Sequence, residues 1–473
     1  MRVSRILLGL ALAAALVSGT ALAVNHMFAD DAPILPRLGK SDANFDGVWR
    51  SRGYGWIWSI EDGRVKAYDE SSDFCMKSPR RAFDVDRSDT QLDRDGAAFG
   101  LLDEDDQYRY IFDRIESVPA SCLTTPLSDP VSVFNAVVKT LDAHYAFFGH
   151  RNVDWVQAVE TARARVTSKT SDLALFRTIS RLLSGFRDSH VSLEGTVGDD
   201  EIEYEPSAQA PPRRVVVSEL SRTPDAVGDW PGYWNPAVVE ELLGETAETA
   251  LDDDMTYGLI DGDIGYLSIK SMSGYSHREA DRATEKALKL FRDAKAVIVD
   301  VSLNDGGYDM SAKRIAGHFA RKRTLAYSKY AGDSKVAIEP QPNYLEPRGD
   351  NSFAGPVYVL TSETTVSAAE IFVMAMRALP NVTQIGETTD GSLSDILSKP
   401  LPNGWSLSLS NEVYLDSNGA AWEGKGIPPK IPFDVRQRSS ASDGDIAAAR
   451  QLIDNIRSIA SEIRPTDGVQ SRS

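Results

Sequence analysis

The strongest constraint on the fold is an alternation of strand-like and helix-like segments in the second half of the chain. Segments 296–301 and 355–360 are mostly apolar and rich in valine, as expected of strands buried on both faces of a sheet. Helix-like patterns occupy about 277–291, where Ser276-His277-Arg278-Glu279 is a capping box, and about 367–379. Because strand–helix–strand alternation favours parallel pairing, we expect an α/β core over residues 261–436.

The aromatic and β-branched clusters of the N-terminal part predict a small antiparallel β domain over residues 45–125. Strand-like segments flank Glu61-Asp62-Gly63, a sequence typical of a hairpin turn. Trp49, Trp56 and Trp58 belong to this region. We interpret them as core residues, and the alternative is that they line a ligand pocket.

Three further segments complete the predicted organisation. Residues 126–195 carry apolar side chains at helical spacing, which indicates a helical domain. Residues 196–260 are acidic and broken by proline and glycine, so we expect an irregular insertion with one short helix near 236–243. Residues 437–473 are expected to form an amphipathic C-terminal helix followed by a tail.

Residues 1–23 have the pattern of a secretory signal peptide. Two arginines precede an apolar run over 6–17, and Ala21-Leu22-Ala23 fits a cleavage signal of small residues. The run is shorter than the roughly 20 residues that a membrane-spanning helix needs, so we expect cleavage rather than a retained anchor. A linker would follow over 24–44. The mature protein would be exported, to the periplasm or outside the cell, with no integral membrane segment.

Export also makes a disulfide permissible. Cys75 and Cys122 are the two cysteines of the chain. We expect them to be bridged, which would stabilise the fold by roughly 4 kcal/mol in the chain-entropy model. The alternative is two separate buried thiols.

Charge and motif content exclude several functional classes. The chain has 51 Lys and Arg against 69 Asp and Glu, a formal net charge of -18, and no basic run offsets it. An acidic surface repels phosphate backbones, so we expect no nucleic-acid partner. No zinc-protease, phosphate-loop or dinucleotide motif is present, and we expect no cofactor or metal. The oligomeric state stays open.

The polar turn after segment 355–360 carries the most informative candidate, Ser367. The predicted helix starts here, so the hydroxyl could simply cap it. The position also suits a nucleophile, because free N–H groups and the positive end of the helix dipole favour a developing oxyanion. The turn lies at the carboxyl edge of the predicted sheet, where α/β proteins place their sites.

A reactive serine needs a base, and the base needs an orienting group. Among the six histidines, His190 differs because it directly follows a long predicted helix, in the sequence Asp188-Ser189-His190. Its position alone leaves a purely structural role open.

Five short motifs follow one another along the chain. They are Asp188-Ser189-His190, the strand-turn Asp300–Gly307, the block Thr361–Glu370, the turn Gly386–Gly391 and the segment Trp422–Pro429. This order resembles the tail-specific protease family, the S41 serine peptidases. The resemblance covers roughly residues 130–435. It implies that the core is a ClpP/crotonase-like mixed sheet with helices, and that the activity is peptide-bond hydrolysis through an acyl-enzyme.

The family has two catalytic arrangements, and the chain resembles that of the tricorn core protease. The other arrangement uses a lysine just after the Gly-Glu-x-Thr-x-Gly block, where this chain has Ser392. The resemblance implies Ser367 as nucleophile and His190 as general base. Ser189 and Glu423 would support this pair, with Glu423 orienting the imidazole through Ser189, as an aspartate does in the Ser-His-Asp triad.

The resemblance also implies an oxyanion hole made of backbone N–H groups. Gly306 or Gly307 would supply one donor and Ala368 the other, because glycine lets the backbone approach the scissile carbonyl closely. The family usually has an arginine where this chain has Ser302, so the loop must be held differently. The peptide-binding PDZ module of the lysine branch is not apparent.

The leading hypothesis is therefore an exported serine endopeptidase acting on protein or peptide substrates. A non-catalytic binding protein for an apolar ligand is one alternative, because relatives reuse this fold without proteolysis. A serine esterase is the other, because acyl transfer to serine is shared chemistry. The presence of all four implied catalytic residues favours the peptidase, since a binding protein need not keep them.

Overall fold

The computed structural model describes most of the chain after the predicted linker. The described residues are 45–62, 64–72, 74–78, 89–92, 95–103, 108–206, 214–216, 242–332, 337–350, 352–432, 435, 450–451 and 453–458. The predicted signal peptide (1–23) and linker (24–44) lie outside them, as does most of the predicted C-terminal helix and tail (437–473). No helix in this described part is long and apolar enough to cross a membrane.

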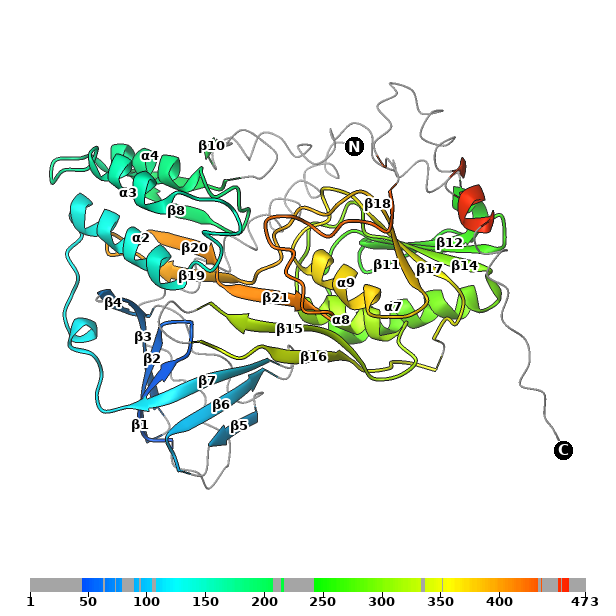
Figure 1. The fold of residues 1–473 in the computed structure, drawn as a ribbon, viewed down its shortest axis with the longest axis horizontal. Helices are drawn as coiled ribbons and strands as arrows, with labels where there is room; N and C mark the ends of the chain where they lie inside the picture. The colour runs from blue at the N-terminus through cyan, green and yellow to red at the C-terminus, as the bar shows by residue number, and fades with distance from the viewer. Residues whose placement is uncertain are drawn as a thin grey trace, which may run out of the picture.

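The N-terminal domain is one antiparallel sheet with the strand order β4-β3-β2-β1-β7-β6-β5, drawn in blue in Figure 1. Its strands are β1 (Gly47–Ser51), β2 (Trp56–Glu61), β3 (Arg64–Ser71), β4 (Phe74–Lys77), β5 (Asp89–Leu92), β6 (Ala98–Asp103) and β7 (Tyr108–Ile115). Trp49 and Trp58 are buried among the rings of Phe99 and Phe112. Trp56 stacks on Tyr54 at 4.5 Å between ring centroids. The interpretation as core residues is confirmed for Trp49 and Trp58, whereas Trp56 is only partly buried against that core.

A disulfide joins Cys75 in β4 to Cys122 in the short helix η3 (Ala120–Leu123). Both cysteines are buried beside Ile57 in a small apolar cluster. The bridge attaches the sheet to the chain segment that leads into the helical part.

The helical part consists of α2 (Pro130–His144), α3 (Trp155–Arg163) and α4 (Asp172–Leu183), whose N-caps are Asp129, Asp154 and Ser171. The helices pack with a second sheet of order β10-β9-β8-β20-β19. Its strands are β8 (Ser192–Val197), β9 (Asp200–Tyr204), β10 (Arg214–Val216), β19 (Ile396–Pro400) and β20 (Ser406–Ser410). Strand β8 follows His190 directly and pairs with β20, so this sheet joins segments about two hundred residues apart in the sequence.

The α/β core is a mixed sheet of order β11-β12-β13-β14-β17-β18-β22. Its strands are β11 (Glu248–Ala250), β12 (Met255–Ile260), β13 (Ile264–Ile269), β14 (Ala296–Asp300), β17 (Val357–Thr361), β18 (Val382–Gly386) and β22 (Ile431–Pro432). Strands β13 to β22 in this order run parallel. The accompanying helices are η4 (Gly244–Thr246), α7 (His277–Leu290), η5 (Phe291–Asp293), α8 (Asp309–Gly317) and α9 (Ala368–Arg377). The α/β core predicted from the strand–helix alternation is confirmed, and the predicted capping box opens α7.

Because β14 and β17 are parallel neighbours, the loops that follow them emerge at the same edge of the sheet. These loops are 301–308 and 362–367, and they hold the predicted glycine turn and Ser367. The topology therefore brings two of the five motifs side by side.

A three-stranded sheet of order β16-β15-β21 connects the core to the N-terminal domain, as Figure 1 shows. Its strands are β15 (Thr324–Ala331), β16 (Gln341–Leu345) and β21 (Glu412–Asp416). The Gln341 side chain pairs with the backbone of Arg109 in β7, accepting at 3.0 Å and donating at 2.8 Å.

Residues 196–260 differ from the irregular insertion that we expected. The structure has β9, β10, β11 and β12 there, and β12 is an inner strand of the core with Met255 and Tyr257 buried. In β9, the charged residues Asp200 and Glu201 are exposed, which made this segment resemble a loop in the sequence. Most of the short helix expected near 236–243 lies outside the described residues, which resume with helical Leu242 and Leu243.

Candidate active site

Ser367 occupies a sharp turn between β17 and α9. It is the N-cap residue of α9, with φ 60° and ψ −128°. Residues other than glycine rarely adopt a positive φ. Such strain, of roughly 1–3 kcal/mol, persists only where the surroundings enforce it, and it concentrates at functional residues.

The hydroxyl of Ser367 does not cap α9. Its side chain accepts no hydrogen bond from the first amides of α9, all of which belong to the described residues. The residue is only half-buried. The capping explanation is therefore wrong, and the hydroxyl stands at the positive end of the helix dipole.

Backbone hydrogen bonds fix the turn from two sides. The Ser367 N–H donates to the carbonyl of Ser392 at 3.0 Å, and the Val366 N–H donates to the carbonyl of Asn304 at 3.2 Å. The position of Ser367 thus depends on both the loop after β14 and the loop after β18.

The two glycines of the loop after β14 lie directly against this turn. Their φ angles are 97° at Gly306 and 134° at Gly307. A Cβ atom on Gly306 would lie 2.7 Å from Ser367 Cβ and 3.2 Å from the Ala368 nitrogen. A Cβ atom on Gly307 would lie 2.5 Å from the backbone carbon of Met272. Both positions therefore require glycine, and the predicted nucleophile and oxyanion residues are brought together.

Asn304, which the sequence did not single out, shapes this loop. It is buried, its Nδ2 donates to the carbonyl of Ile269 at 2.9 Å, and its Oδ1 accepts from the Gly306 N–H at 2.9 Å. The Gly306 N–H is thereby engaged. Among the described residues, no acceptor engages the N–H of Gly307 or of Ala368.

Side-chain hydroxyls hold the base of the loop in the absence of the family's arginine. Asp300 Oδ1 accepts from the amide and hydroxyl of Ser302, at 2.8 and 2.6 Å. Asp300 Oδ2 accepts from the Tyr266 hydroxyl at 2.5 Å. The carbonyl of Ser302 accepts from the hydroxyls of Ser362 and Thr364, at 2.5 and 2.6 Å.

His190 lies just beyond α4 and is buried. Its backbone N–H donates to Asp188 Oδ1 at 3.0 Å. Burial lowers the pKa of the imidazole and outweighs the opposing effect of the Asp188, Asp395 and Asp390 carboxylates. The ring is therefore neutral near pH 7, the form that a general base requires.

The segment after β18 contacts the turn that holds Ser367 and acts electrostatically on His190. The charge of Asp390 acts on His190, and the Asp390 N–H donates to the carbonyl of Thr365 at 3.0 Å, two residues before Ser367. No hydrogen bond joins the His190 ring to the Ser367 hydroxyl, and His190 Nδ1 is buried without a hydrogen-bond partner in the described chain. Such bonds are often formed only in the substrate complex.

The expected contact between Glu423 and Ser189 is not formed. Glu423 Oε2 accepts from the amides of Leu393 and Ser394, at 2.8 and 3.1 Å, and Oε1 accepts from Arg151 Nη2 at 2.5 Å. The Ser189 hydroxyl is buried without a hydrogen-bond partner among the residues described. Burial, together with the charge of Asp188, raises the pKa of Glu423 to about 7, against the opposing effect of Arg151.

Arg151 is a site residue that sequence reasoning missed. Its side chain is 5% exposed and contacts both Glu423 and Asp188, the latter at 3.4 Å from Nε. It also donates to the carbonyls of Arg187 and Gly391. Burial alone would lower the pKa of Arg151, but the two carboxylates outweigh this effect and raise the pKa. Arg151 lies between α2 and α3, and no local pattern distinguishes it from a surface arginine.

Glu370, in the first turn of α9, anchors the segment after β18. Its Oε1 accepts from the Thr389 hydroxyl at 2.5 Å and the Gly391 amide at 2.9 Å, and its Oε2 accepts from the Ser392 amide at 2.8 Å. Burial and the nearby charge of Asp390 raise the pKa of Glu370 to about 8. This glutamate belongs to the motif Thr361–Glu370, but its role depends on contacts that the motif does not show.

None of the lysines considered from the sequence reaches Ser367 in the structure. At the dyad-lysine place, the Ser392 hydroxyl donates to Asp390 Oδ1 at 2.7 Å. Lys399, the nearest lysine downstream, is buried and donates to Asp69 Oδ1 at 2.9 Å in the N-terminal domain. Lys425 is exposed.

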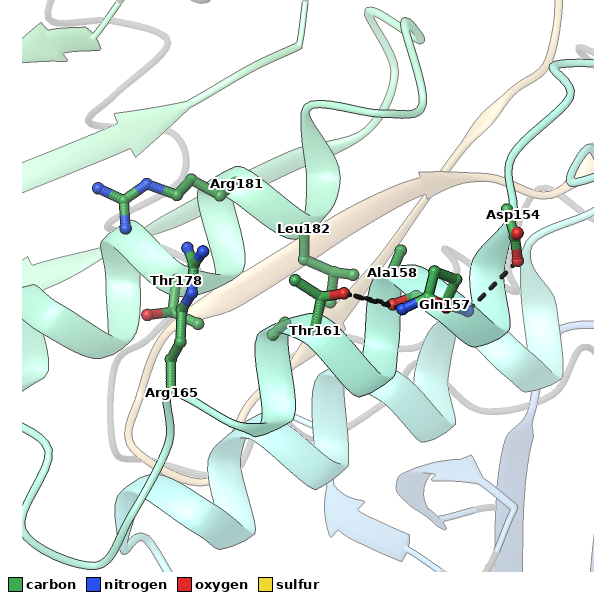
Figure 2. Close-up of a pocket in the computed structure, with 9 residues that line it drawn as sticks. Asp154, Gln157, Ala158, Thr161, Arg165, Thr178, Arg181 and Leu182 are labelled. Carbon is green, nitrogen blue, oxygen red and sulfur yellow. Dashed lines mark hydrogen bonds between the residues drawn. The ribbon is translucent and has the colours of Figure 1, made fainter.

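A separate pocket of about 300 Å³ lies between α3 and α4 (Figure 2). It is lined by side chains such as Asp154, Gln157, Arg165 and Arg181, and by none of the candidate catalytic residues. Within the described ranges, no group of three or more His, Cys, Asp or Glu side chains is placed to hold a metal ion.

Comparison with known proteins relates the core of the chain to a peptidase family. The model of peptidase family S41 matches residues 263–433. The carboxy-terminal processing proteases CtpA and CtpB of Bacillus subtilis (strain 168) are similar, at 28% identity over 176 residues and 26% over 191 residues. These matches cover 37% and 40% of this chain. They span 36% and 37% of the two relatives, little more than a third of their lengths.

Two solved structures share the fold. One is a protein of Parabacteroides merdae ATCC 43184, named only as a candidate peptidase, with 26% identity and a TM-score of 0.55 over 73% of this chain and 100% of that chain. The other is mature CPAF in complex with lactacystin, with 12% identity and a TM-score of 0.51 over 71% of this chain and 98% of that chain. The second likeness concerns the fold alone. Residues 263–433, which hold Ser367, Gly306 and Ala368, are therefore similar to peptidase family S41, the tail-specific protease family.

Proposed function

We propose that this protein is an exported serine endopeptidase that cleaves peptide bonds through an acyl-enzyme on Ser367. The observation that carries the proposal is the strained, uncapped Ser367 at the start of α9, packed against the glycine loop. A serine that only capped the helix would need neither the positive φ nor the glycine beside it. The match of residues 263–433 to peptidase family S41 supports the same class of reaction.

In the first half of the proposed reaction, the Ser367 hydroxyl attacks the scissile carbonyl and His190 takes its proton. The N–H groups of Gly307 and Ala368 hold the oxyanion, because the Gly306 N–H already donates to Asn304. The imidazolium then gives its proton to the departing amine, and the acyl group stays on Ser367.

In the second half, His190 accepts a proton from water, which attacks the acyl carbonyl. The same two N–H groups hold the second oxyanion, and the ester bond to Ser367 breaks. The imidazolium returns the proton to Ser367, and the carboxylic acid product leaves. A neutral, buried imidazole supports this use of His190 in both halves.

Ser189 and Glu423 complete the proposed tricorn-like arrangement. Both lie in the buried region around His190. Ser189 directly precedes His190, and the Ser189 hydroxyl and His190 Nδ1 are both buried without hydrogen-bond partners among the described residues. We assign the orientation of the imidazole to Ser189. Glu423 acts through the amides of Leu393 and Ser394 and through Arg151, rather than by direct contact with Ser189.

Export to the periplasm or outside the cell is the proposed location. The signal-like sequence of residues 1–23 supports it. The disulfide between Cys75 and Cys122 also supports it, because disulfides persist in oxidising compartments. The substrates would then be exported proteins or peptides.

The experiment that tests the proposed function compares wild type with Ser367→Ala on a peptide library and on matched ester substrates. Ser168→Ala is the control, because Ser168 is exposed in the connection between α3 and α4. Peptide cleavage by wild type and Ser168→Ala but not by Ser367→Ala supports a peptidase. Cleavage of esters alone would support an esterase, and no cleavage of either class would support the non-catalytic alternative.

A further inference from the structure

One buried lysine has no part in the proposed reaction. Lys329 lies in the middle of β15 and has no exposed surface. A buried ammonium is costly unless it is paired. Lys329 Nζ donates to Asp395 Oδ2 at 2.9 Å and to the Tyr414 hydroxyl at 3.1 Å, and it lies 3.0 Å from Glu412 Oε2.

A third carboxylate ties this lysine to the oxyanion loop. Asp309 Oδ2 lies 3.9 Å from Lys329 Nζ and accepts a hydrogen bond from the Tyr414 hydroxyl. Asp309 is the first residue of α8, two positions after Gly307. Any shift of Asp309 therefore moves the end of the loop that presents the Gly307 N–H.

The other two carboxylates tie the lysine to the segment that supports Ser367 and His190. Asp395 lies three residues after Ser392, whose carbonyl accepts a hydrogen bond from the Ser367 amide. The charge of Asp395 also acts on His190. The Glu412 amide donates to the Ser394 hydroxyl at 2.9 Å. One ammonium thus connects both loops that fix the nucleophile.

The N-terminal domain also contacts this cluster. The Tyr54 hydroxyl donates to Glu412, and Lys329 Nζ lies 4.9 Å from the ring centroid of Tyr108. The rings of Tyr108 and Tyr414 flank the ammonium, which favours a cation. Without the ammonium, Asp309, Asp395 and Glu412 would repel one another.

We propose that Lys329 is a positioning residue that holds the oxyanion loop and the 392–395 segment in register around Ser367. This inference rests on the proposed function for its effect on catalysis. It does not make Lys329 a base, since the lysine is engaged by carboxylates and touches none of the reacting groups named above.

Lys399 provides a matched control. It is also buried, on β19, and its ammonium donates to Asp69 at 2.9 Å and to the Tyr54 carbonyl at 2.5 Å. Both lysines thus hold the N-terminal domain, but these Lys399 contacts do not include Asp309 or Asp395. Lys399→Met therefore removes a buried ion pair that includes neither Asp309 nor Asp395.

The experiment compares Lys329→Met, Lys329→Arg and Lys399→Met with wild type. One readout is kcat and KM on a cleaved peptide, and the other is amide hydrogen exchange in residues 304–310 and 390–396. We expect Lys329→Met to lower kcat by about 100-fold with little change in KM, as misplacement of reacting groups does, and to speed exchange in both segments. Lys329→Arg should recover part of kcat, and Lys399→Met should leave exchange in both segments unchanged.

Amide exchange at the wild-type rate in both segments of folded Lys329→Met would overturn the inference. A loss of kcat in Lys399→Met as large as that in Lys329→Met would also overturn it. If wild type shows no Ser367-dependent hydrolysis, the proposed function fails, whereas hydrogen exchange still decides whether Lys329 holds the two loops. Should Lys329→Met not fold, Tyr414→Phe removes the hydroxyl between Lys329 and Asp309 and keeps the charges. Faster exchange in residues 304–310 of Tyr414→Phe supports the inference, and unchanged exchange contradicts it.

Discussion

Gly306 faces Ser367 so closely that a Cβ atom built on the glycine would lie 2.7 Å from Ser367 Cβ. The contact joins the loop after β14 to the turn after β17, the two carboxyl ends that parallel pairing places at one edge of the core sheet. The strained backbone of Ser367 and the positive φ of Gly306 therefore depend on each other.

Gly306→Ala should lower kcat by about 100-fold, because the added methyl group must displace either Ser367 or the oxyanion loop. Gly404→Ala is the matched control. Gly404 also has a positive φ, 86°, but nothing lies within 4 Å of its Cβ position. Steady-state kinetics of both variants check the prediction, and equal losses would mean that backbone strain, rather than contact with Ser367, is responsible.

The pH profile should report a neutral imidazole. Because burial lowers the pKa of His190, the imidazole stays unprotonated at pH 7. Activity should therefore fall only at a pH below about 6.5, the ordinary pKa of histidine. His190→Ala should lower kcat by roughly 10⁴-fold or more, whereas Lys425→Ala, at an exposed lysine, should be neutral. If activity instead rises with pH through a pKa well above 7, and if His190→Ala keeps this activity, the base is a lysine.

Arg151→Met should destabilise the fold by about 3–5 kcal/mol, because it leaves Asp188 and Glu423 buried without their shared counter-charge. Denaturant unfolding measures this effect. Arg165→Met, at an exposed arginine of the pocket in Figure 2, is the control and should change stability little. A stability loss no larger in Arg151→Met than in Arg165→Met would show that Arg151 does not hold the site.

Glu370 should make the protein less stable as the pH rises. The folded protein keeps on Glu370 a proton that the unfolded chain releases, because the pKa rises from 4.5 to about 8 on folding. Its contribution to the free energy of unfolding is therefore lost between about pH 4.5 and pH 8. Glu370→Gln should reduce this slope, whereas exposed Glu160→Gln should keep it. Identical slopes in all three proteins would contradict the assigned pKa.

The sequence predicted the elements whose signals are local. The apolar strand Ala296–Asp300 and the capping box at Ser276 depend on neighbouring residues, and the structure has both. The pairing of β8 with β20 was not predictable, because it joins Ser192 to Ser408 and leaves no local pattern. Strand β9 was missed because its exposed charges, Asp200 and Glu201, resemble those of a loop.

The same distinction between local and distant signals applies to the residues of the candidate site. Ser367 and the glycine loop were found because they combine a family motif with a local turn. Arg151 and Lys329 were missed, because each is important only through buried partners that lie far away in the sequence, such as Glu423 for Arg151 and Asp395 for Lys329. A lone basic residue in a sequence gives no sign of whether it is buried.

The most direct test of Ser367 as nucleophile is covalent labelling with a fluorophosphonate, followed by mass spectrometry of the modified peptide. The account predicts one modified residue, Ser367, with labelling abolished in Ser367→Ala, retained in Ser168→Ala and strongly slowed in His190→Ala. Labelling of Ser367→Ala at the wild-type rate, or modification of folded wild type at another serine only, would contradict it.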